Sequence, residues 1–300
     1  MVLGAAGLAL LCAAPAAAGE TGAFLKIPAG ARAVGLGSAY TAMADDAASV
    51  AWNPAGLGHV GRRELTATHA ELFAGLRHEF MAAAAPTPLG TLGLAAELLT
   101  QSDLEGRDAQ GRQTGSLAAS DRAVTVALGR TLGRFQLGGG VRFIESKLAD
   151  ATARTLAVDI GGQAKAGAVF GVPLSLGAAV RNLGPGLSYG GTREPLPTTL
   201  SAGAAVRLPA GLTMAAEWRW RPNGDKAEFG LGTEYAVLPS VALRAGFATT
   251  RAVSGGAAIG GLAGLGAGLG LRLGRLGLDY AFTPFGELGN VQRLSLGVRW

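Results

Sequence analysis

The stretch Asn290-Val291-Gln292-Arg293-Leu294-Ser295-Leu296-Gly297-Val298-Arg299-Trp300 alternates between apolar and polar residues almost without fault and stops on an aromatic residue. Leu294, Leu296, Val298 and Trp300 share one face, whereas Arg293, Ser295, Gly297 and Arg299 share the other. One apolar and one polar face predict an antiparallel strand. A chain that ends on such a strand is typical of outer-membrane barrels, in which the last strand pairs with the first and aromatic residues lie at the membrane interfaces.

The composition agrees with this interpretation. The chain has 300 residues, 49 of them glycine, and a mean hydropathy of +0.31. That value is high for a water-soluble enzyme, and the glycine content is high for a helical protein. After the first 18 residues, no stretch gives the roughly 18 apolar residues of a membrane helix. An apolar chain without such a helix is expected of a barrel whose lipid-facing residues occur at every second position.

Residues 1–18 are predicted to be a cleaved signal peptide. An apolar core from Leu3 to Ala14 is followed by Pro15 and by three alanines ahead of Gly19, which form a small-residue cleavage site. No basic residue precedes the core, so we expect the start codon to lie upstream of Met1. The single cysteine, Cys12, lies inside this core behind the large Leu11, so lipidation is not expected. The mature chain would have no thiol for a disulfide or a metal.

The net charge of +5 comes from arginines scattered singly along the chain. No basic run interleaved with aromatic residues occurs, so nucleic acid is not expected as a partner. Basic groups that face a lumen, outer-membrane lipid or anionic lipopolysaccharide explain this charge more simply.

From Glu64 onward the alternation predicts about fourteen strands. The strand at 212–221 illustrates the rule, with Trp218 and Trp220 outward and Glu217, Arg219 and Arg221 inward. The other strands that the pattern marks most clearly are 199–208, 227–237, 265–273, 276–283 and 290–300. Those at 64–73, 78–85 and 91–100 are marked less clearly.

The connections are predicted to alternate between short turns and longer loops, which places both ends of the barrel on the periplasmic side. Longer connections are expected at 101–117, 146–154, 182–197, 249–261 and 284–289.

Small residues dominate the inward positions, and something must fill the lumen that they leave. Residues 19–62 lack the strand rhythm, so they are predicted to form a hatch, or plug, inside a barrel of residues 63–300. A short helix is expected from Ser38 to Val50, closed by Trp52-Asn53-Pro54, because proline bars its continuation.

The segment Phe24-Leu25-Lys26-Ile27-Pro28-Ala29-Gly30-Ala31-Arg32-Ala33-Val34-Gly35-Leu36-Gly37-Ser38-Ala39-Tyr40, with Ala44-Asp45-Asp46-Ala47 and Trp52-Asn53-Pro54-Ala55-Gly56-Leu57, closely resembles the opening of the PorV/PorQ family. That family is similar to the FadL-type transporters of the outer membrane. The resemblance implies an all-β, fourteen-stranded transmembrane barrel with an N-terminal hatch. It also places Asn53, Pro54 and Ala55 in the hatch.

Several groups of residues have two interpretations. Asp45 and Asp46 could serve acid–base chemistry, but adjacent carboxylates diverge on a helix. We expect them to orient the hatch or to pair with lumen arginines such as Arg142, Arg244 or Arg272. The turn from Trp52 to Gly56 is either a plain helix stop or the element that shapes a gate.

The remaining marked residues are aromatics and histidines. Interface aromatics are expected at Trp218, Trp220, Tyr235, Tyr280 and Trp300. His59, His69 and His78 lack metal-ligand spacing, so neither a metal nor a cofactor is expected.

Two functions fit the sequence. The first is a passive conduit for a hydrophobic ligand in the bacterial outer membrane, gated by the hatch and lined by Phe24, Leu25, Ile27 and Leu36. The second is a closed interaction barrel of the type IX secretion system that binds secretion-system proteins through its outer loops, as the PorV/PorQ resemblance implies. No nucleophile elbow, P-loop or grouped Ser/His/carboxylate set occurs, so an enzyme is not expected.

Overall fold

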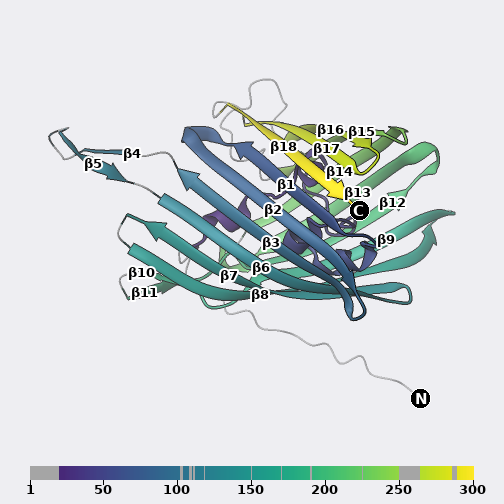
Figure 1. Ribbon diagram of the computed structural model, residues 1–300, viewed down its shortest axis with the longest axis horizontal. Helices are drawn as coiled ribbons and strands as arrows, with labels where there is room; N and C mark the ends of the chain where they lie inside the picture. The colour runs from purple at the N-terminus through teal and green to yellow at the C-terminus, as the bar shows by residue number, and fades with distance from the viewer. Residues whose placement is uncertain are drawn as a thin grey trace, which may run out of the picture.

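A computed structural model describes residues 20–101, 104–107, 110, 112–117, 119–149, 151–169, 171–189, 191–224, 226–249, 264–285 and 289–300. Within these ranges, fourteen antiparallel strands close into a barrel (Figure 1). The strands are β1 (Glu64–Glu71), β2 (Leu76–Thr87), β3 (Gly90–Gln101), β6 (Ala119–Leu132), β7 (Phe135–Leu148), β8 (Ala151–Val169), β9 (Val172–Leu183), β12 (Thr199–Arg207), β13 (Leu212–Arg221), β14 (Lys226–Leu238), β15 (Val241–Ala248), β16 (Leu265–Leu273), β17 (Leu276–Pro284) and β18 (Asn290–Arg299). None of the described helices has the length and apolar character needed to cross a membrane.

The barrel closes where the chain begins and ends its sheet. β1 pairs with β18 over eight residue pairs, from Glu64↔Arg299 to Glu71↔Gln292. The backbone of Arg63 and Trp300 continues this pairing through two further hydrogen bonds of 3.2 and 3.0 Å. The predicted fold class, a closed barrel of about fourteen strands with the last paired to the first, is confirmed.

The strands alternate between buried and exposed side chains, as the sequence predicts. In β13, Glu217, Arg219 and Arg221 are buried inside the barrel while Met214 and Trp218 are exposed on its outer surface. In β18, Arg293 and Ser295 face inward and Leu294 and Leu296 face outward. A continuous apolar surface of this kind is rarely exposed to water. The outer wall is therefore expected to contact an apolar medium or a partner molecule.

The two ends of the barrel differ. Six connections at one end, including Leu208–Gly211 and Gly274–Arg275, are tight, and the same end holds Arg63 and Trp300; we call it the turn end. At the opposite loop end, two connections carry hairpins outside the barrel, β4 (Leu104–Arg107) with β5 (Gln113–Leu117) and β10 (Leu187–Tyr189) with β11 (Thr192–Glu194).

Other loop-end connections are short. The predicted long loop at 146–154 is wrong, because β7 and β8 pair up to Leu148↔Ala151. Short 3-10 helices make two further loop-end connections: η3 (Phe73–Gly75) joins β1 to β2, and η5 (Pro222–Gly224) joins β13 to β14. The predicted signal peptide and the predicted loop at 249–261, apart from Thr249, lie outside the described residues.

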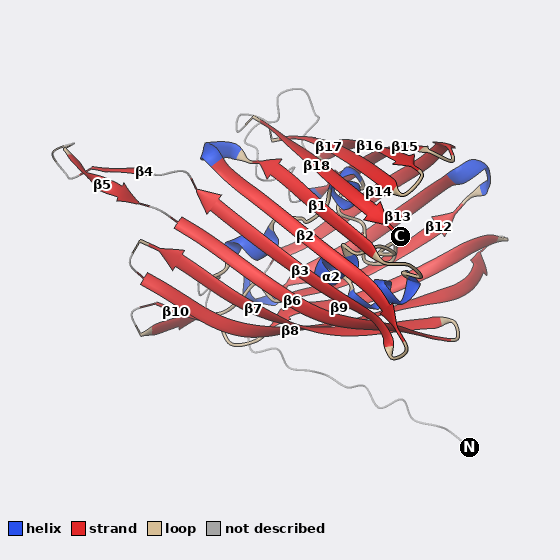
Figure 2. Cartoon of the chain, in the orientation of Figure 1, coloured by secondary structure: helices blue, strands red, loops and turns tan. Residues whose placement is uncertain are grey.

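Residues 20–62, which we call the inner segment, lie against the inward faces of the strands (Figure 2). The segment contains η1 (Ala23–Lys26), α1 (Ala31–Gly35), α2 (Ser49–Trp52) and η2 (Pro54–His59). It starts at the loop end, where Thr21 N donates to Pro195 O at 3.0 Å. It reaches the turn end at Gly58, whose carbonyl accepts from Thr131 Oγ1 at 2.7 Å.

The helix predicted from Ser38 to Val50 is wrong. Gly37 and Ser38 have left-handed φ angles of 62° and 63°, which end the preceding turn, and helix α2 covers Ser49–Trp52 alone. The reason is tertiary. The backbone N–H groups of Tyr40 and Thr41 both donate to Glu217 Oε2 of β13 at 2.7 Å. The side-chain amides of Asn53 and Gln163 also donate to Thr41 O, and Gln163 donates to Ala44 O. These carbonyls therefore bind side chains instead of the N–H groups four residues further on that a helix would use.

Glycines on the inner wall allow the inner segment to approach closely. A Cβ on Gly129 would lie 2.6 Å from Pro54 O and 2.6 Å from Leu57 Cβ, and one on Gly232 would meet the backbone of Leu36. Both contacts are shorter than side chains tolerate. The inner segment thus fills the space beside these inward glycines, and no open channel remains at these positions.

We predict that Gly129→Ala destabilises the barrel by about 1–3 kcal/mol, because the new methyl group overpacks Pro54 and Leu57. The temperature at which the folded form converts to the unfolded form on an electrophoresis gel measures this effect. Gly162→Ala is the matched control, since its methyl group would meet nothing nearer than Leu137 Cδ2 at 3.6 Å. Equal melting of the two variants would contradict the close packing.

Candidate functional site

The start of the inner segment is fastened to the β10–β11 hairpin. Thr21 Oγ1 donates to Glu194 O at 2.8 Å, and Phe24 and Leu25 share a buried cluster with Leu187 and Leu196. Backbone bonds and apolar packing therefore hold residues 20–25 beneath the hairpin. An outer connection and the inner segment together form one side of the loop-end mouth.

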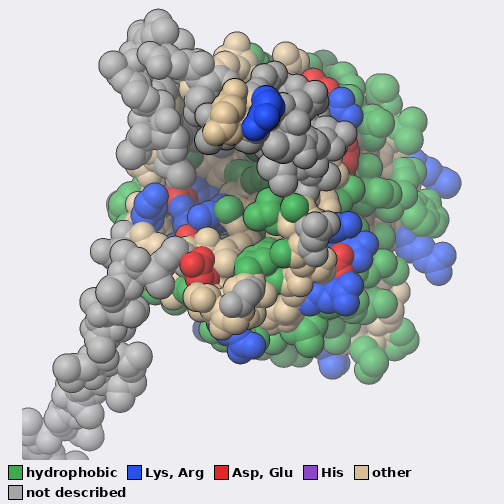
Figure 3. All heavy atoms as spheres, turned by 90° about the vertical axis from the view of Figure 1, so that its left-hand side faces the viewer, with side chains coloured by type: hydrophobic (Ala, Val, Ile, Leu, Met, Phe, Trp, Pro, Cys, Tyr) green, Lys and Arg blue, Asp and Glu red, His purple; other side chains and the backbone are tan. Residues whose placement is uncertain are grey.

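Beside this contact lies a cavity of about 450 Å³, which we call the loop-end cavity. Its apolar lining comes from the inner segment and from outer connections, namely Leu25, Ile27, Pro28, Leu72, Phe73, Leu76 and Phe285. Phe73 and Phe285 approach each other across two connections, with ring centroids 6.2 Å apart. Figure 3 views this end and shows a hollow bordered by hydrophobic, basic and acidic side chains. The volume falls within the range of small-molecule sites.

The floor of the loop-end cavity carries three arginines, two of which have a carboxylate beside them: Glu97 is 4.0 Å from Arg142 and Glu228 is 3.6 Å from Arg219. Arg142, Arg181 and Arg219 line it from β7, β9 and β13. Arg181 Nη1 donates to Ala51 O at 2.7 Å, and its guanidinium lies 5.4 Å from the Trp52 ring, but it has no carboxylate within 4 Å among the described residues. The Nε atoms of all three arginines are buried without a hydrogen-bond partner. Such donors beside a cavity suit an anionic group of a ligand.

The structure separates the four residues that were expected to line a ligand path. Leu25 and Ile27 line the loop-end cavity, but Phe24 and Leu36 do not. Phe24 is turned toward Leu187 and Leu196. Leu36 is fully buried, and its backbone lies against Gly232 and Gly246 of the wall. The expectation for Phe24 and Leu36 is corrected, because η1 and α1 turn these side chains into packed contacts.

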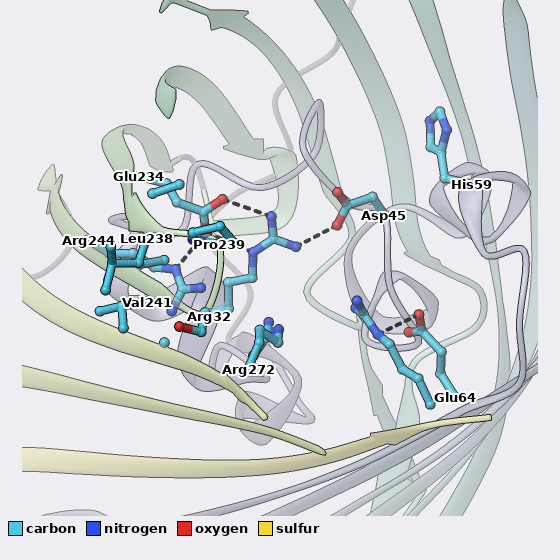
Figure 4. Close-up of a pocket in the computed structure, with 15 residues that line it drawn as sticks. Arg32, Asp45, His59, Glu64, Glu234, Leu238, Pro239, Val241, Arg244 and Arg272 are labelled. Atoms are coloured by element: carbon cyan, nitrogen blue, oxygen red, sulfur yellow. Dashed lines mark hydrogen bonds and ion pairs between the residues drawn. The ribbon is translucent and has the colours of Figure 1, made fainter. Parts of the chain in front are cut away.

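A network of charges lies toward the turn end of the barrel, beside a turn-end cavity of about 330 Å³ (Figure 4). Arg32 of α1 is its centre. Its guanidinium contacts Asp45 at 2.5 Å, Asp46 at 3.5 Å and Glu234 of β14 at 3.0 Å. Glu234 in turn binds Arg244 at 2.6 Å. Arg32 thus connects two parts of the inner segment to the wall.

The expected pairing of Asp45 and Asp46 with Arg142, Arg244 or Arg272 is wrong, whereas the alternative that they orient the hatch stays a prediction. Arg142 binds Asp159 at 2.8 Å, while Arg244 and Arg272 both bind Asp279. The aspartates pair with Arg32 of their own segment instead, because α1 folds back beside the turn that carries them. No role was predicted for Arg32 from the sequence. The only signal was that Arg32 lies within the stretch that resembles the PorV/PorQ family.

Burial is the largest influence on the pKa of Asp46. It raises the pKa of the Asp46 carboxyl above its ordinary value of 3.8, while the Arg32 charge opposes this shift. The Tyr40 hydroxyl donates to Asp46 Oδ2 at 2.7 Å, and burial raises the pKa of that hydroxyl as well. For Arg32, burial would lower the pKa, but the charges of Asp45 and Glu234 outweigh it and raise the pKa.

The turn from Trp52 to Gly56 is buried between the loop-end cavity and the charge network around Arg32. Trp52 lines the loop-end cavity, and its Nε1 donates to Ala29 O at 2.9 Å. Asn53 uses its whole amide, donating to Thr41 O and Gly162 O and accepting from Ala55 N. Pro54 and Ala55 pack against Gly138 of β7. A Cβ on Gly56 would lie 2.6 Å from Ser49 Oγ, so this glycine is needed for close packing.

The predicted interface aromatics lie on the outer wall, two toward the loop end, two toward the turn end and one between these levels. Trp218 and Trp220 stack at 6.4 Å toward the loop end, whereas Tyr235 and Trp300 are exposed toward the turn end. Tyr280 lies between these levels and donates its hydroxyl to Gln292 Oε1 at 3.0 Å. Their role at a membrane interface stays a prediction.

The three histidines have separate protein partners: His59 meets Gln163 at 2.9 Å, His78 meets Glu97 at 2.9 Å, and His69 meets Glu79. Among the described residues, no three His, Cys, Asp or Glu side chains gather in a way that could hold a metal ion.

Comparison with solved structures shows that the fold is similar to those of several transporters and channels. The toluene transporter TbuX of Ralstonia pickettii matches with a TM-score of 0.63 and 14% identity over 91% of this chain and 98% of its own. The toluene transporter TodX of P. putida matches with a TM-score of 0.58 and 11% identity, over 85% and 94%. The CymD monoaromatic hydrocarbon channel matches with a TM-score of 0.51 and 11% identity, over 90% and 96%.

At the sequence level, residues 15–145 match the model of an uncharacterised protein family, UPF0164. No curated protein sequence matches the chain. The resemblance to the PorV/PorQ family stays a hypothesis.

We predict that Asp46→Asn gains stability relative to the natural protein as pH rises. A raised pKa means that the folded protein binds the Asp46 proton more tightly than the unfolded chain does. The stability gained from this proton is fully present below the pKa of Asp46 in the unfolded chain, and it is lost as pH rises through the pKa of Asp46 in the folded protein. The difference in melting temperature should therefore grow in favour of the variant from about pH 4 and become constant above the pKa of Asp46. A difference independent of pH would contradict the raised pKa.

Proposed function

We propose that the protein is an outer-membrane conduit for hydrophobic small molecules, with the inner segment as its gate. The observation that carries the proposal is the loop-end cavity, in which apolar side chains of the outer connections and of Leu25, Ile27 and Trp52 face one space. The exposed apolar outer wall and the FadL-type fold support the membrane placement. In this placement the loop end faces outward and the turn end faces the periplasm. The proposal assigns no catalytic role to the chain.

The neighbouring structures support a hydrophobic cargo. TbuX and TodX are described as toluene transporters and CymD as a monoaromatic hydrocarbon channel. In our proposal the cargo of this protein is likewise apolar, and the basic floor of Arg142, Arg181 and Arg219 favours a molecule that also carries an acidic group.

Passage requires the inner segment to move, because below the loop-end cavity it packs directly on the wall. Gly129, Gly232 and Gly246 contact the inner segment so closely that a methyl group at any of these positions would overlap it. A molecule of toluene size cannot pass such contacts unless they open.

We predict that a disulfide between the inner segment and the wall blocks uptake. A Cβ on Gly203 of β12 would lie 3.6 Å from the Cβ of Ala42, which suits a disulfide. Uptake of radiolabelled toluene by intact cells that carry the protein in their outer membrane should fall to the level of cells without it in oxidised Ala42→Cys/Gly203→Cys and return on reduction. Ala42→Cys alone is the control. Equal flux through the oxidised and reduced double variant would refute gating by this segment.

We predict that Arg181→Gln lowers the affinity for an apolar acid about tenfold or more, because a charge-assisted hydrogen bond is lost. Radiolabelled decanoate and decan-1-ol distinguish the charge from the tail, and binding of the alcohol should change little. Lys147→Gln, which removes an exposed charge of β7 outside the cavity, is the control. Equal loss of decanoate and decanol binding would show that the floor does not select an acid.

A further inference from the structure

Four arginines lie exposed along one edge of the turn end. Arg62 and Arg63 precede β1, Arg130 lies near the end of β6, and Arg134 lies in the turn between β6 and β7. Arg130 is beside Gly90, and the inner segment joins these strands from within, since Thr91 Oγ1 donates to Val60 O at 3.1 Å. The four residues therefore border the neighbouring strands β1, β2, β3, β6 and β7, and we call them the arginine edge.

The arginine edge has no acidic partner among the described residues. The carboxylates of the turn end are turned into the barrel and paired there, Glu64 with Arg299 at 2.9 Å, Glu234 with Arg32 and Arg244, and Asp279 with Arg244 and Arg272. At the loop end, by contrast, the exposed Arg122 and Arg154 both bind Glu145. Exposed basic residues without an ion pair among the described residues also occur elsewhere, as at Arg275 and Arg193, so the arginine edge is distinguished by having four of them on neighbouring strands.

Apolar side chains border the same edge on the outside of the barrel. Leu89 is 71% exposed and Trp300 is 50% exposed, and Leu132 and Phe135 stand on either side of the β6–β7 turn. The guanidinium of Arg134 lies 5.0 Å from the centre of the Phe135 ring. Basic groups just beyond a belt of exposed apolar residues occupy the depth at which lipid phosphates meet water.

We infer that the arginine edge binds the phosphate groups of anionic glycerophospholipids in the periplasmic leaflet. Arginine is suited to this role because its planar guanidinium donates two parallel hydrogen bonds to a phosphate. An acidic protein would satisfy the charge, but it would not account for Leu89, Leu132, Phe135 and Trp300 beside it. The inference rests on the membrane placement of the proposed function and not on conduction.

The test compares Arg62→Gln/Arg63→Gln/Arg130→Gln/Arg134→Gln with the natural protein in a mild detergent. Native mass spectrometry counts bound phosphatidylglycerol and phosphatidylethanolamine over a lipid titration. The natural protein should retain phosphatidylglycerol preferentially, and the variant should bind it at least about tenfold more weakly, since each basic residue contributes to attraction by an anionic surface. Phosphatidylethanolamine binding should be similar in both.

The matched control, Arg77→Gln/Arg122→Gln/Lys147→Gln/Arg193→Gln, removes the same charge at the loop end and should bind phosphatidylglycerol like the natural protein. Equal loss in both variants would reduce the effect to net charge and overturn the inference. Competition by inorganic phosphate at equal concentration would assign the edge to free phosphate instead. An acidic periplasmic protein that binds the edge while lipid binding is unaffected by the four substitutions would also overturn it. Toluene flux through the edge variant tests the conduit independently.

Discussion

The pairing of β1 with β18 is the constraint on which the rest of the structure depends. Once these strands join, the described sheet has no open edge, and each strand has one face inside and one outside. The apolar face can then be satisfied only by an apolar exterior, and the polar face only by what fills the lumen. The inner segment meets the second demand, because its backbone and charges are partners for Glu217, Gln163 and Glu234.

The strands could be predicted from the sequence because their signal is local. In β13 and β16 the alternation alone gives the observed bounds, and it also predicts that Glu217 and Arg219 face inward. The inner segment could not be predicted in the same way. Residues 38–48 have helix-compatible composition, yet their backbone is fixed by Glu217 and Gln163, which lie more than a hundred residues away.

The candidate site shows the same division. The resemblance identified the stretch that carries Asp45, Asp46 and Asn53, but the face that each residue presents depends on the fold. Leu25 and Leu36 are equally apolar in sequence, and one lines the loop-end cavity while the other is packed on glycines. The arginine floor was foreseeable in part, since Arg142 and Arg219 lie at inward positions. That Arg181 would stack on Trp52 was not, because nothing local joins them.

The inner segment is held in two physically different ways, and this bears on how a gate would move. From residue 30 onward it is fixed by the partly buried ion pairs of Arg32 with Asp45 and Glu234 and by backbone contacts on wall glycines, which leave no room for gradual loosening. Residues 20–28 are held to the barrel by Thr21 and by the side chains of Phe24 and Leu25, while the Lys26–Glu20 ion pair lies within this stretch. A ligand in the loop-end cavity touches this more weakly held part first. In the proposed conduit, displacement therefore starts at the β10–β11 hairpin, and the Arg32 network sets the larger barrier further along.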